Sequence, residues 1–327
     1  MGKVLEDRRN ETRLRFEQLR KELAAAEKLA DQKACVYATG SFGRGEASKH
    51  SDLDLFIVGR GSKNPRELSR ITEICIEADL IEATQRLGIP EFSGDGKYLV
   101  HLSEQELIET LGEPEDDASN TFTARLLLLL ESKPLLGVTI YEKAIENVVA
   151  AYWRDYTKHK NEFLPAFLAN DVLRLWRTFC LNYEARTETE PERKRAERKL
   201  KNYKLKHSRL LTCYSALLYL LAIYADKKTV HPDDAIGMTR LSPTERLEAL
   251  LNRADLAESY ETIRKLLANY EAFLEASSFP KEDLIDRFLD AEKSKVYSQS
   301  ERELGDLMFS AIEQIGKKSA FHRVLLV

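Results

Sequence analysis

The spacing of apolar residues predicts alternating helices and strands in the N-terminal region of the chain. Residues 4–32 carry apolar side chains near helical spacing among many charges, which predicts an amphipathic helix. Residues 35–38 and 53–58 are short apolar runs next to glycines and indicate buried strands. Residues 65–87 predict a further helix that ends before a glycine, and residues 98–102 predict a third strand.

From Ser119 onward the pattern is helical and predicts no strand. The segments with helical spacing are 120–132, 139–157, 161–185, 192–225, 243–252, 255–276, 281–293 and 298–323. Just before them, Ser103 and Glu106 have the spacing of a capping box at a helix start. We therefore expect an α+β chain, with a mixed-sheet domain at residues 1–137 and an all-helical domain at residues 138–327.

Composition narrows the class of protein. A length of 327 residues suits two domains, and a net charge of −4 gives no general case for nucleic-acid binding. The four cysteines form no CxxC pair, so we expect neither a zinc site nor a disulfide framework, and a reducing compartment. Apolar runs such as Leu126–Leu130 are too short to cross a bilayer, and the charged N-terminus lacks a signal-peptide core. We expect a cytoplasmic protein without a membrane partner.

A glycine-rich turn follows the first predicted strand. Residues 40–45 read Gly-Ser-Phe-Gly-Arg-Gly, and glycines such as Gly40 let a backbone approach a ligand closely. Ser41 offers a hydroxyl group and an amide, and a helix that starts near Phe42 would direct free N–H groups at a phosphate. Arg44 adds a guanidinium that can reach a triphosphate oxygen. Alone, such a turn is common in α/β proteins and decides little.

Two carboxylates follow the turn by about ten residues. Asp52 and Asp54 are two positions apart on a predicted strand, so their side chains share one face while Leu53 and Leu55 face the core. Neighbouring acids repel each other unless a cation lies between them, and Mg²⁺ prefers oxygen ligands. The alternative is a polar strand edge with Asp52 as a turn residue. Together, turn and acids indicate a triphosphate and one or two metal ions held side by side.

This combination resembles the signature of the DNA polymerase β-type nucleotidyltransferase superfamily. The shared pattern is Gly-Ser, a gap of about ten residues, and Asp-hydrophobic-Asp-hydrophobic, within residues 40–58. Gly-Ser-Phe-Gly-Arg-Gly-Glu with Ser-Asp-Leu-Asp-Leu is most similar to the branch of bacterial protein uridylyltransferases and adenylyltransferases. Residues 123–137 resemble the helix that closes the transferase domain in those proteins. The resemblance covers about residues 35–137.

The resemblance implies a metal-dependent nucleotidyltransferase that moves NMP from an NTP to an acceptor hydroxyl and releases pyrophosphate. Gly40, Ser41 and Arg44 would bind the triphosphate, while Asp52 and Asp54 would hold Mg²⁺, with two ions expected and Mn²⁺ as an alternative. A protein side chain is the favoured acceptor, and an RNA end or a small molecule is the alternative. A catalytically inactive nucleotide-binding regulatory protein is the alternative of another class.

The third carboxylate that this superfamily places on a neighbouring strand has no clear counterpart. The predicted strand at 98–102 carries no acid, so Asp95 is the first candidate for the catalytic base and Glu91 the second. Asp95 lies between two glycines, where an aspartate often serves only as a turn residue. His101 is an alternative site residue or a structural histidine.

The helical region adds one candidate cluster. Asp171, Arg174 and Arg177 are three or four residues apart and share one helix face. They could line the cleft and contact the nucleotide, or form an intrahelical ion-pair set beside the core.

Residues 192–209 form a strongly basic segment. Nine lysines and arginines face two glutamates there, which gives a charge of +7 before His207. The segment could grip an RNA backbone or an acidic protein, or present Lys204 or Lys206 to the nucleotide. A solvated basic face is the alternative.

Overall fold

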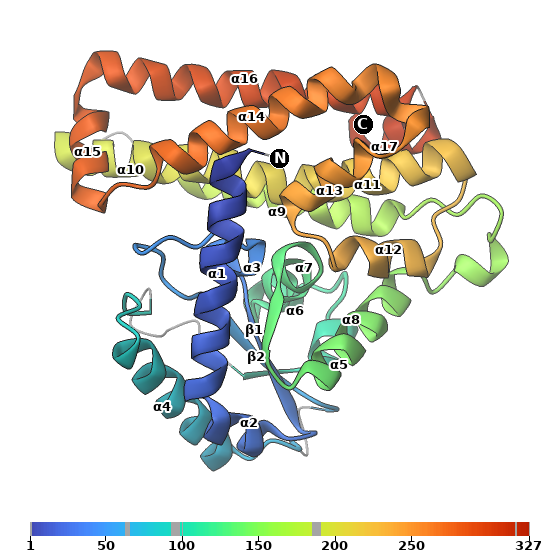
Figure 1. The fold of residues 1–327 in the computed structure, drawn as a ribbon. Helices are drawn as coiled ribbons and strands as arrows, with labels where there is room; N and C mark the ends of the chain where they lie inside the picture. Colours follow the sequence, from blue (N-terminus) through green and yellow to red (C-terminus); the bar gives the residue numbers. More distant parts are fainter. Residues whose placement is uncertain are drawn as a thin grey trace. The chain divides into compact units, whose positions relative to one another are not determined.

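The computed structural model describes residues 2–62, 66–92, 99, 101–184, 191–317 and 319–326, without the side chains of residues 182–184. The chain forms two compact units, Glu6–Arg154 and Asp155–Val327, the second of which includes Met1–Leu5. Among the described residues, the strands all belong to the first unit, and the second is helical (Figure 1). The predicted α+β class is confirmed. The predicted domain boundary, after residue 137, falls inside the first unit.

In the described part of the chain, the sheet is mixed and has four strands. They are β1 (Ala34–Ala38), β2 (Leu55–Gly59), β3 (His101–Ser103) and β4 (Lys133–Leu136), in the spatial order β3-β2-β1-β4. β1 pairs antiparallel with β2 and with β4, whereas β2 pairs parallel with β3. All of β1 and β2 is buried, as the continuous apolar runs in their sequences predict. β2 starts at Leu55, so the two acids before it lie at the entrance of the strand rather than within it.

One strand contradicts the expectation that residues after Ser119 form none. β4 is only four residues long, contains Pro134, and occupies an edge of the sheet. Proline lacks the N–H that a central strand needs, but an edge strand tolerates it. The segment was missed because so short a run with a proline carries no strand periodicity.

The helices of the sheet unit are α1 (Lys3–Glu22), α2 (Ala24–Ala30), α3 (Gly40–Arg44), α4 (Arg70–Arg86), α5 (Glu104–Glu109), α6 (Glu115–Ala118), α7 (Thr121–Glu131) and α8 (Val138–Tyr152). The predicted helix at 4–32 is therefore broken at Leu23. α4 starts later than predicted because Ser69 caps it, accepting a hydrogen bond from the Thr72 amide at 3.2 Å. The capping box of Ser103 with Glu106 is confirmed.

Helices cover both faces of the sheet. Val36 and Ala38 of β1 belong to the core shared with α1, α2 and α4. Tyr37 points to the opposite face, because side chains alternate along a strand. Its hydroxyl group donates to the Ala124 carbonyl of α7 at 3.0 Å, and its ring lies 6.1 Å from that of Tyr141 on α8. Packing of α8 on β1 explains why this helix belongs to the sheet unit.

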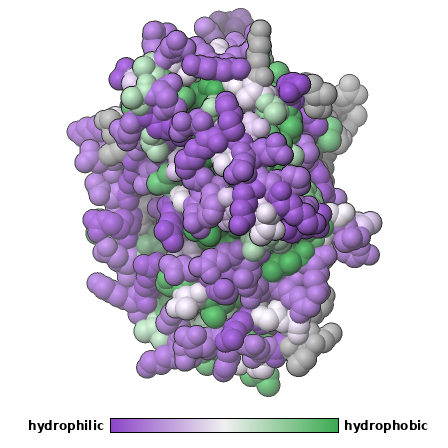
Figure 2. All heavy atoms as spheres, turned by 90° about the vertical axis from the view of Figure 1, so that its right-hand side faces the viewer, coloured by the Kyte–Doolittle hydropathy of each residue, from purple (hydrophilic) through white to green (hydrophobic). Residues whose placement is uncertain are grey.

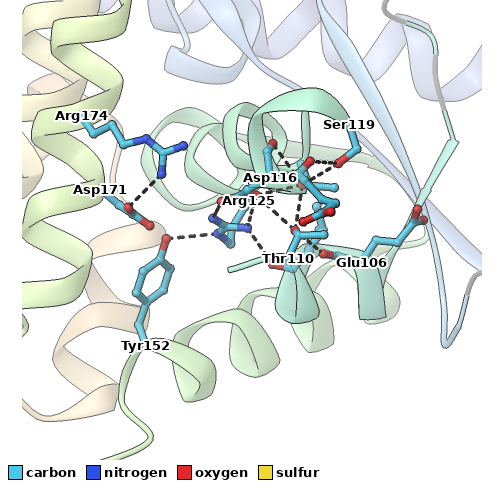
Figure 3. A network of polar contacts seen from close by, with 11 residues as sticks. Glu106, Thr110, Asp116, Ser119, Arg125, Tyr152, Asp171 and Arg174 are labelled. Carbon is cyan, nitrogen blue, oxygen red and sulfur yellow. Dashed lines mark hydrogen bonds and ion pairs between the residues drawn. The ribbon is translucent and has the colours of Figure 1, made fainter. Parts of the chain in front are cut away.

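A buried arginine joins α5, α6, α7 and α8 (Figure 3). Arg125 of α7 is fully buried and pairs with Asp116 of α6, with one nitrogen–oxygen distance of 2.9 Å. It also donates to the Leu107 carbonyl of α5 at 3.0 Å and to the Tyr152 hydroxyl of α8 at 3.1 Å. Burial acts to lower the pKa of Arg125, but its bonds to Asp116 and Tyr152 outweigh burial and raise the pKa. The side chain therefore stays charged.

The second unit consists of α9 (Ala166–Glu184), α10 (Glu192–Lys204), α11 (Leu210–Lys227), α12 (Pro232–Thr239), α13 (Pro243–Leu250), α14 (Tyr260–Ala276), α15 (Lys281–Leu289), α16 (Ala291–Gly316) and α17 (Ala320–Leu326), with short helical turns at Tyr156–Lys158 and Ala254–Ser259. A π-helical turn, Leu205–Arg209, joins α10 and α11 into one continuous helix. α14 and α16 run side by side (Figure 1).

By length and composition, one helix among the described residues could span a membrane. It covers Glu192–Lys227, and 78% of its apolar window is buried inside the fold, as in the core helix of a folded domain. The face of the molecule in Figure 2 is mostly hydrophilic, with scattered small apolar patches.

Candidate functional site

The predicted phosphate turn forms the short helix α3, directly after β1. Gly40 begins it with a φ of +63°, a conformation that favours glycine. A Cβ atom on Gly40 would lie 2.6 Å from the Asp54 Oδ2 atom, so only glycine fits there. The structure therefore places the Asp54 carboxylate against the first residue of the turn, as the combined sequence motif predicts.

The two acids lie at the entrance of β2. The Thr39 amide donates to the Asp54 carbonyl at 2.9 Å, which continues the β1–β2 ladder up to the turn. Asp52 and Asp54 are half-buried, while Leu53 is 1% exposed and Leu55 is 3% exposed. This alternation is that of an extended segment with both acids on one face and both leucines in the core. Ser41 is also half-exposed, so three polar side chains of the motif remain accessible.

Arg44 does not share this exposure. Its side chain is 8% exposed and lies between two carboxylates, with Nε 2.8 Å from Glu46 and Nη1 2.9 Å from Glu131. Glu131, at the end of α7, also accepts a hydrogen bond from the Gly40 amide at 3.0 Å. One glutamate therefore holds both the first residue and the arginine of the turn. Triphosphate binding by Arg44 stays a prediction.

Backbone packing fixes the turn as well. A Cβ atom on Gly43 would lie 1.9 Å from the Glu131 carbonyl oxygen and 2.7 Å from the Ala38 carbonyl oxygen. Both obstacles are backbone atoms that cannot move aside. The turn therefore needs glycine at this position to lie between β1 and α7.

Sequence reasoning missed the roles of Glu46 and Glu131. Glu46 follows the glycine-rich turn directly and could have been suspected as a partner for Arg44. Glu131 lies 91 residues from Gly40, and no local pattern links the two. Its position at the end of the helix that resembles the closing helix of relatives was the only signal.

Candidates for the third carboxylate are tested only in part. Asp95 lies outside the described residues, and its role as catalytic base stays a prediction. Glu91 is exposed, in the segment after α4. β3 pairs in parallel with the second half of β2, from Ile57 to Gly59.

His101 does not lie at the motif. It pairs with Ile57 in the sheet, and its Nε2 atom would be 2.2 Å from a Cβ atom on Gly59, at the far end of β2 from Asp54. Its Nδ1 atom is 3.7 Å from Glu73 of α4. Burial lowers the pKa of His101 against the opposing effect of Glu73. The structural interpretation of this histidine is therefore the better supported.

The helical candidates belong to the second unit. Asp171 and Arg174 form an ion pair at 3.8 Å along α9 (Figure 3). Arg177 is exposed. The ion pair supports the intrahelical alternative for the first two residues.

Lys204 is exposed at the end of α10, and its contact with the nucleotide stays a prediction. Several other residues of the basic segment form ion pairs, such as Arg193 with Asp286 at 3.1 Å.

Asp52 and Asp54 suit a divalent cation whose other ligands come from the substrate. No group of three or more His, Cys, Asp or Glu side chains with metal-binding geometry occurs among the described residues. Two accessible carboxylates would leave most of the coordination shell of Mg²⁺ to water and phosphate oxygens, as is usual for this ion. The Thr39 hydroxyl, beside the turn, is buried without a hydrogen-bond partner in the described part of the chain. The donor set therefore fits a substrate-bound cation.

Comparison with protein families gives one match. Residues 16–119 match the family model of a nucleotidyltransferase domain. The matched segment contains α3, both acids and strands β1 to β3. Searches of curated proteins and of solved structures find no match.

Proposed function

We propose that this chain, in which residues 16–119 form a nucleotidyltransferase domain, transfers NMP from an NTP to an acceptor hydroxyl group and releases pyrophosphate. Such domains are found in transferase enzymes and typically use a nucleoside triphosphate with a divalent metal ion. The observation that carries the proposal is the close approach of the Asp54 carboxylate to Gly40. It supports a metal-binding acid directly beside a phosphate-binding turn.

Each exposed side chain of the motif has a role in the proposal. Ser41 offers an accessible hydroxyl group to the triphosphate, together with the backbone amides of the turn. Asp52 and Asp54 hold Mg²⁺, with Mn²⁺ as the alternative, and the bound cation supplies positive charge to the polyphosphate oxygens. Arg44 is held in the turn by Glu46 and Glu131, and its proposed role is to supply positive charge to the bound triphosphate.

The reaction proposed is an in-line displacement. The acceptor oxygen forms a bond with the α-phosphorus, the bond to the bridging oxygen breaks, and pyrophosphate leaves. Asp95 would take the proton of the acceptor hydroxyl. The chain contributes mainly by positioning the reactants and neutralising charge, since phosphoryl transfer needs little other help.

The proposed class of acceptor rests on the family resemblance alone. A tyrosine or serine side chain of another protein is favoured, and an RNA end or a small molecule is the alternative. Lys204 would assist in binding the nucleotide. We propose a cytoplasmic location, in line with the buried state of the one long apolar helix.

The test is nucleotide transfer by paired variants. Wild-type protein is incubated with each labelled NTP, Mg²⁺ and a cell extract, and label is followed into protein, RNA and small molecules. Asp52→Asn and Asp54→Asn should each lower transfer by about a hundredfold or more, because charge stabilisation at the reacting phosphate is lost. Asp79→Asn is the matched control, since this half-buried aspartate lies on α4 outside the motif.

Two results would count against the proposal. Transfer at the wild-type rate by both motif variants would refute the assignment of the acids. Metal-dependent triphosphate binding by the wild type, without pyrophosphate release with any acceptor fraction, would favour the inactive regulatory alternative.

A further inference from the structure

A pocket of about 470 Å³ lies entirely within the helical unit. α10 forms one wall, α16 forms the other, and the end of α15 closes it; the lining residues include Arg195, Lys199, Phe288, Ser294, Lys295 and Arg302. Its volume falls in the range of small-molecule sites, about 300–1,000 Å³. None of the roles proposed for the nucleotidyltransferase motif involves it.

The lining is strongly cationic. Arg195 and Lys199 lie one helical turn apart on α10, and Arg302 contributes from α16, where Lys295 is already paired with Glu292 at 2.7 Å. Glu192 is the one carboxylate among the described lining residues. Like charges gathered in this way repel each other and raise the free energy of the fold unless an anion joins them. The pocket therefore has a net positive charge of a kind that favours anions.

These cations differ from the rest of the basic segment. Lys201 lies 3.4 Å from Glu197, and Lys206 lies 3.3 Å from Glu301, so both are already paired. Arg195, Lys199 and Arg302 have no carboxylate within ion-pair distance among the described residues. Two cations of the basic segment, Arg195 and Lys199, are therefore available to a ligand at the pocket.

The pocket also contains two serine residues and an apolar wall. Ser294 is 8% exposed and lies in the first turn of α16, where backbone dipoles favour negative charge. The Ser298 hydroxyl donates to the Ser294 carbonyl at 3.1 Å, one turn further along. Phe288, buried at the end of α15, completes the lining.

The surroundings favour a compact ligand over a long polyanion. Beyond Arg302, the adjoining hollow on α16 is lined by Glu303 and Asp306. A phosphodiester chain that left the pocket on this side would meet two carboxylates. We propose that the pocket binds a compact small molecule that carries two or more phosphate groups.

Isothermal titration calorimetry tests this site with inorganic tripolyphosphate as the probe. The full chain is titrated in metal-free buffer, so that metal-dependent binding at the aspartates does not contribute. One tripolyphosphate should bind per chain, and raised salt should weaken binding. Lys199→Ala/Arg302→Ala should weaken it by about tenfold or more, because two charge-assisted contacts are lost. The control Lys194→Ala/Lys265→Ala removes the same charge from exposed positions outside the pocket and should leave binding within about twofold.

The outcomes separate this site from the transfer reaction. Absence of tripolyphosphate binding, or equal weakening of binding by both double variants, would refute the pocket as a phosphate-binding site. Neither result would affect the proposed transfer reaction. A single-stranded oligoribonucleotide is titrated in the same way. If it binds more tightly than tripolyphosphate and Lys199→Ala/Arg302→Ala abolishes this binding, the ligand of the pocket is RNA, and the proposal of a compact ligand is refuted.

Discussion

Two buried arginines in the sheet unit show how the same interaction can serve different ends. Arg44 lies between Glu46 and Glu131, and Arg125 pairs with Asp116. Both side chains are at most 8% exposed. A buried charge that loses its partner is costly, so each carboxylate is as important as the arginine that it faces.

The two networks differ in what else their carboxylates hold. Asp116 accepts a further hydrogen bond from the Thr121 hydroxyl at 2.8 Å, within the helices that Arg125 joins. Glu131 accepts from the Gly40 amide, beside Asp54. The Arg125 network therefore determines how helices assemble, whereas the Arg44 network also determines the conformation of the phosphate turn.

The largest effect is expected from Arg125→Met. It leaves the carboxylate of Asp116 fully buried without its cation, which should lower the free energy of unfolding by about 3–5 kcal/mol. Urea denaturation followed by circular dichroism measures this loss. The control Arg86→Met breaks exposed ion pairs with Glu22 and Glu82 and should change the free energy of unfolding far less. Equal free energies of unfolding for both variants would contradict the large contribution assigned to the buried Arg125–Asp116 pair.

His207 sharpens the comparison, because it is a buried basic group without a carboxylate partner among the described residues. Its Nδ1–H donates to the Tyr203 carbonyl at 2.9 Å, and its Nε2 atom lies 3.1 Å from the Ser300 hydroxyl. Burial lowers the pKa of His207 from 6.5 to about 4. The unfolded chain therefore takes up the proton first, and stability present above pH 6.5 is lost as the pH falls toward 4.

The expected loss is about 3 kcal/mol over this interval. Carboxylates also titrate there, so the measurement is the difference between wild type and His207→Gln in urea denaturation at about pH 7 and about pH 4.5. The variant should lose less stability on acidification than the wild type does. The same pH dependence in both proteins would show that His207 is readily protonated in the fold.

Glu131→Gln should have a smaller effect on the free energy of unfolding than Arg125→Met, because Arg44 keeps Glu46 as its partner. Glutamine can still accept from the Gly40 amide, but it cannot neutralise Arg44. We expect the KM for NTP to rise by about tenfold in the folded enzyme, because the turn is no longer held in place. Asp116→Asn is the matched change in the other network, and it should lower stability while KM and kcat per folded molecule stay unchanged. Unchanged KM in both variants would reduce Glu131 to a structural role.

Local features were predictable from the sequence. The apolar runs of β1 and β2 and the capping box at Ser103 depend on neighbouring residues only, and each occurs as predicted. The approach of Asp54 to the turn was also predictable, because the hairpin that joins β1 to β2 brings together residues close in sequence.

Features that depend on distant contacts were not predictable. Glu131 reaches Gly40 across 91 residues, and the partners of Arg125 come from three other helices. The basic segment looked uniform in sequence, yet carboxylates from α15 and α16 neutralise some of its cations and leave others at a pocket. Charge on a helix can be read from the sequence, whereas its neutralisation by other helices cannot.

The proline in β4 has a consequence for how this protein behaves at high concentration. Pro134 offers no N–H to an incoming strand, and its carbonyl oxygen already accepts from Arg20 of α1 at 2.6 Å. β4 therefore presents fewer free backbone groups at this edge of the sheet to a strand from a second copy of the chain. A segment too short to be recognised as a strand makes this edge less prone to pair with another chain.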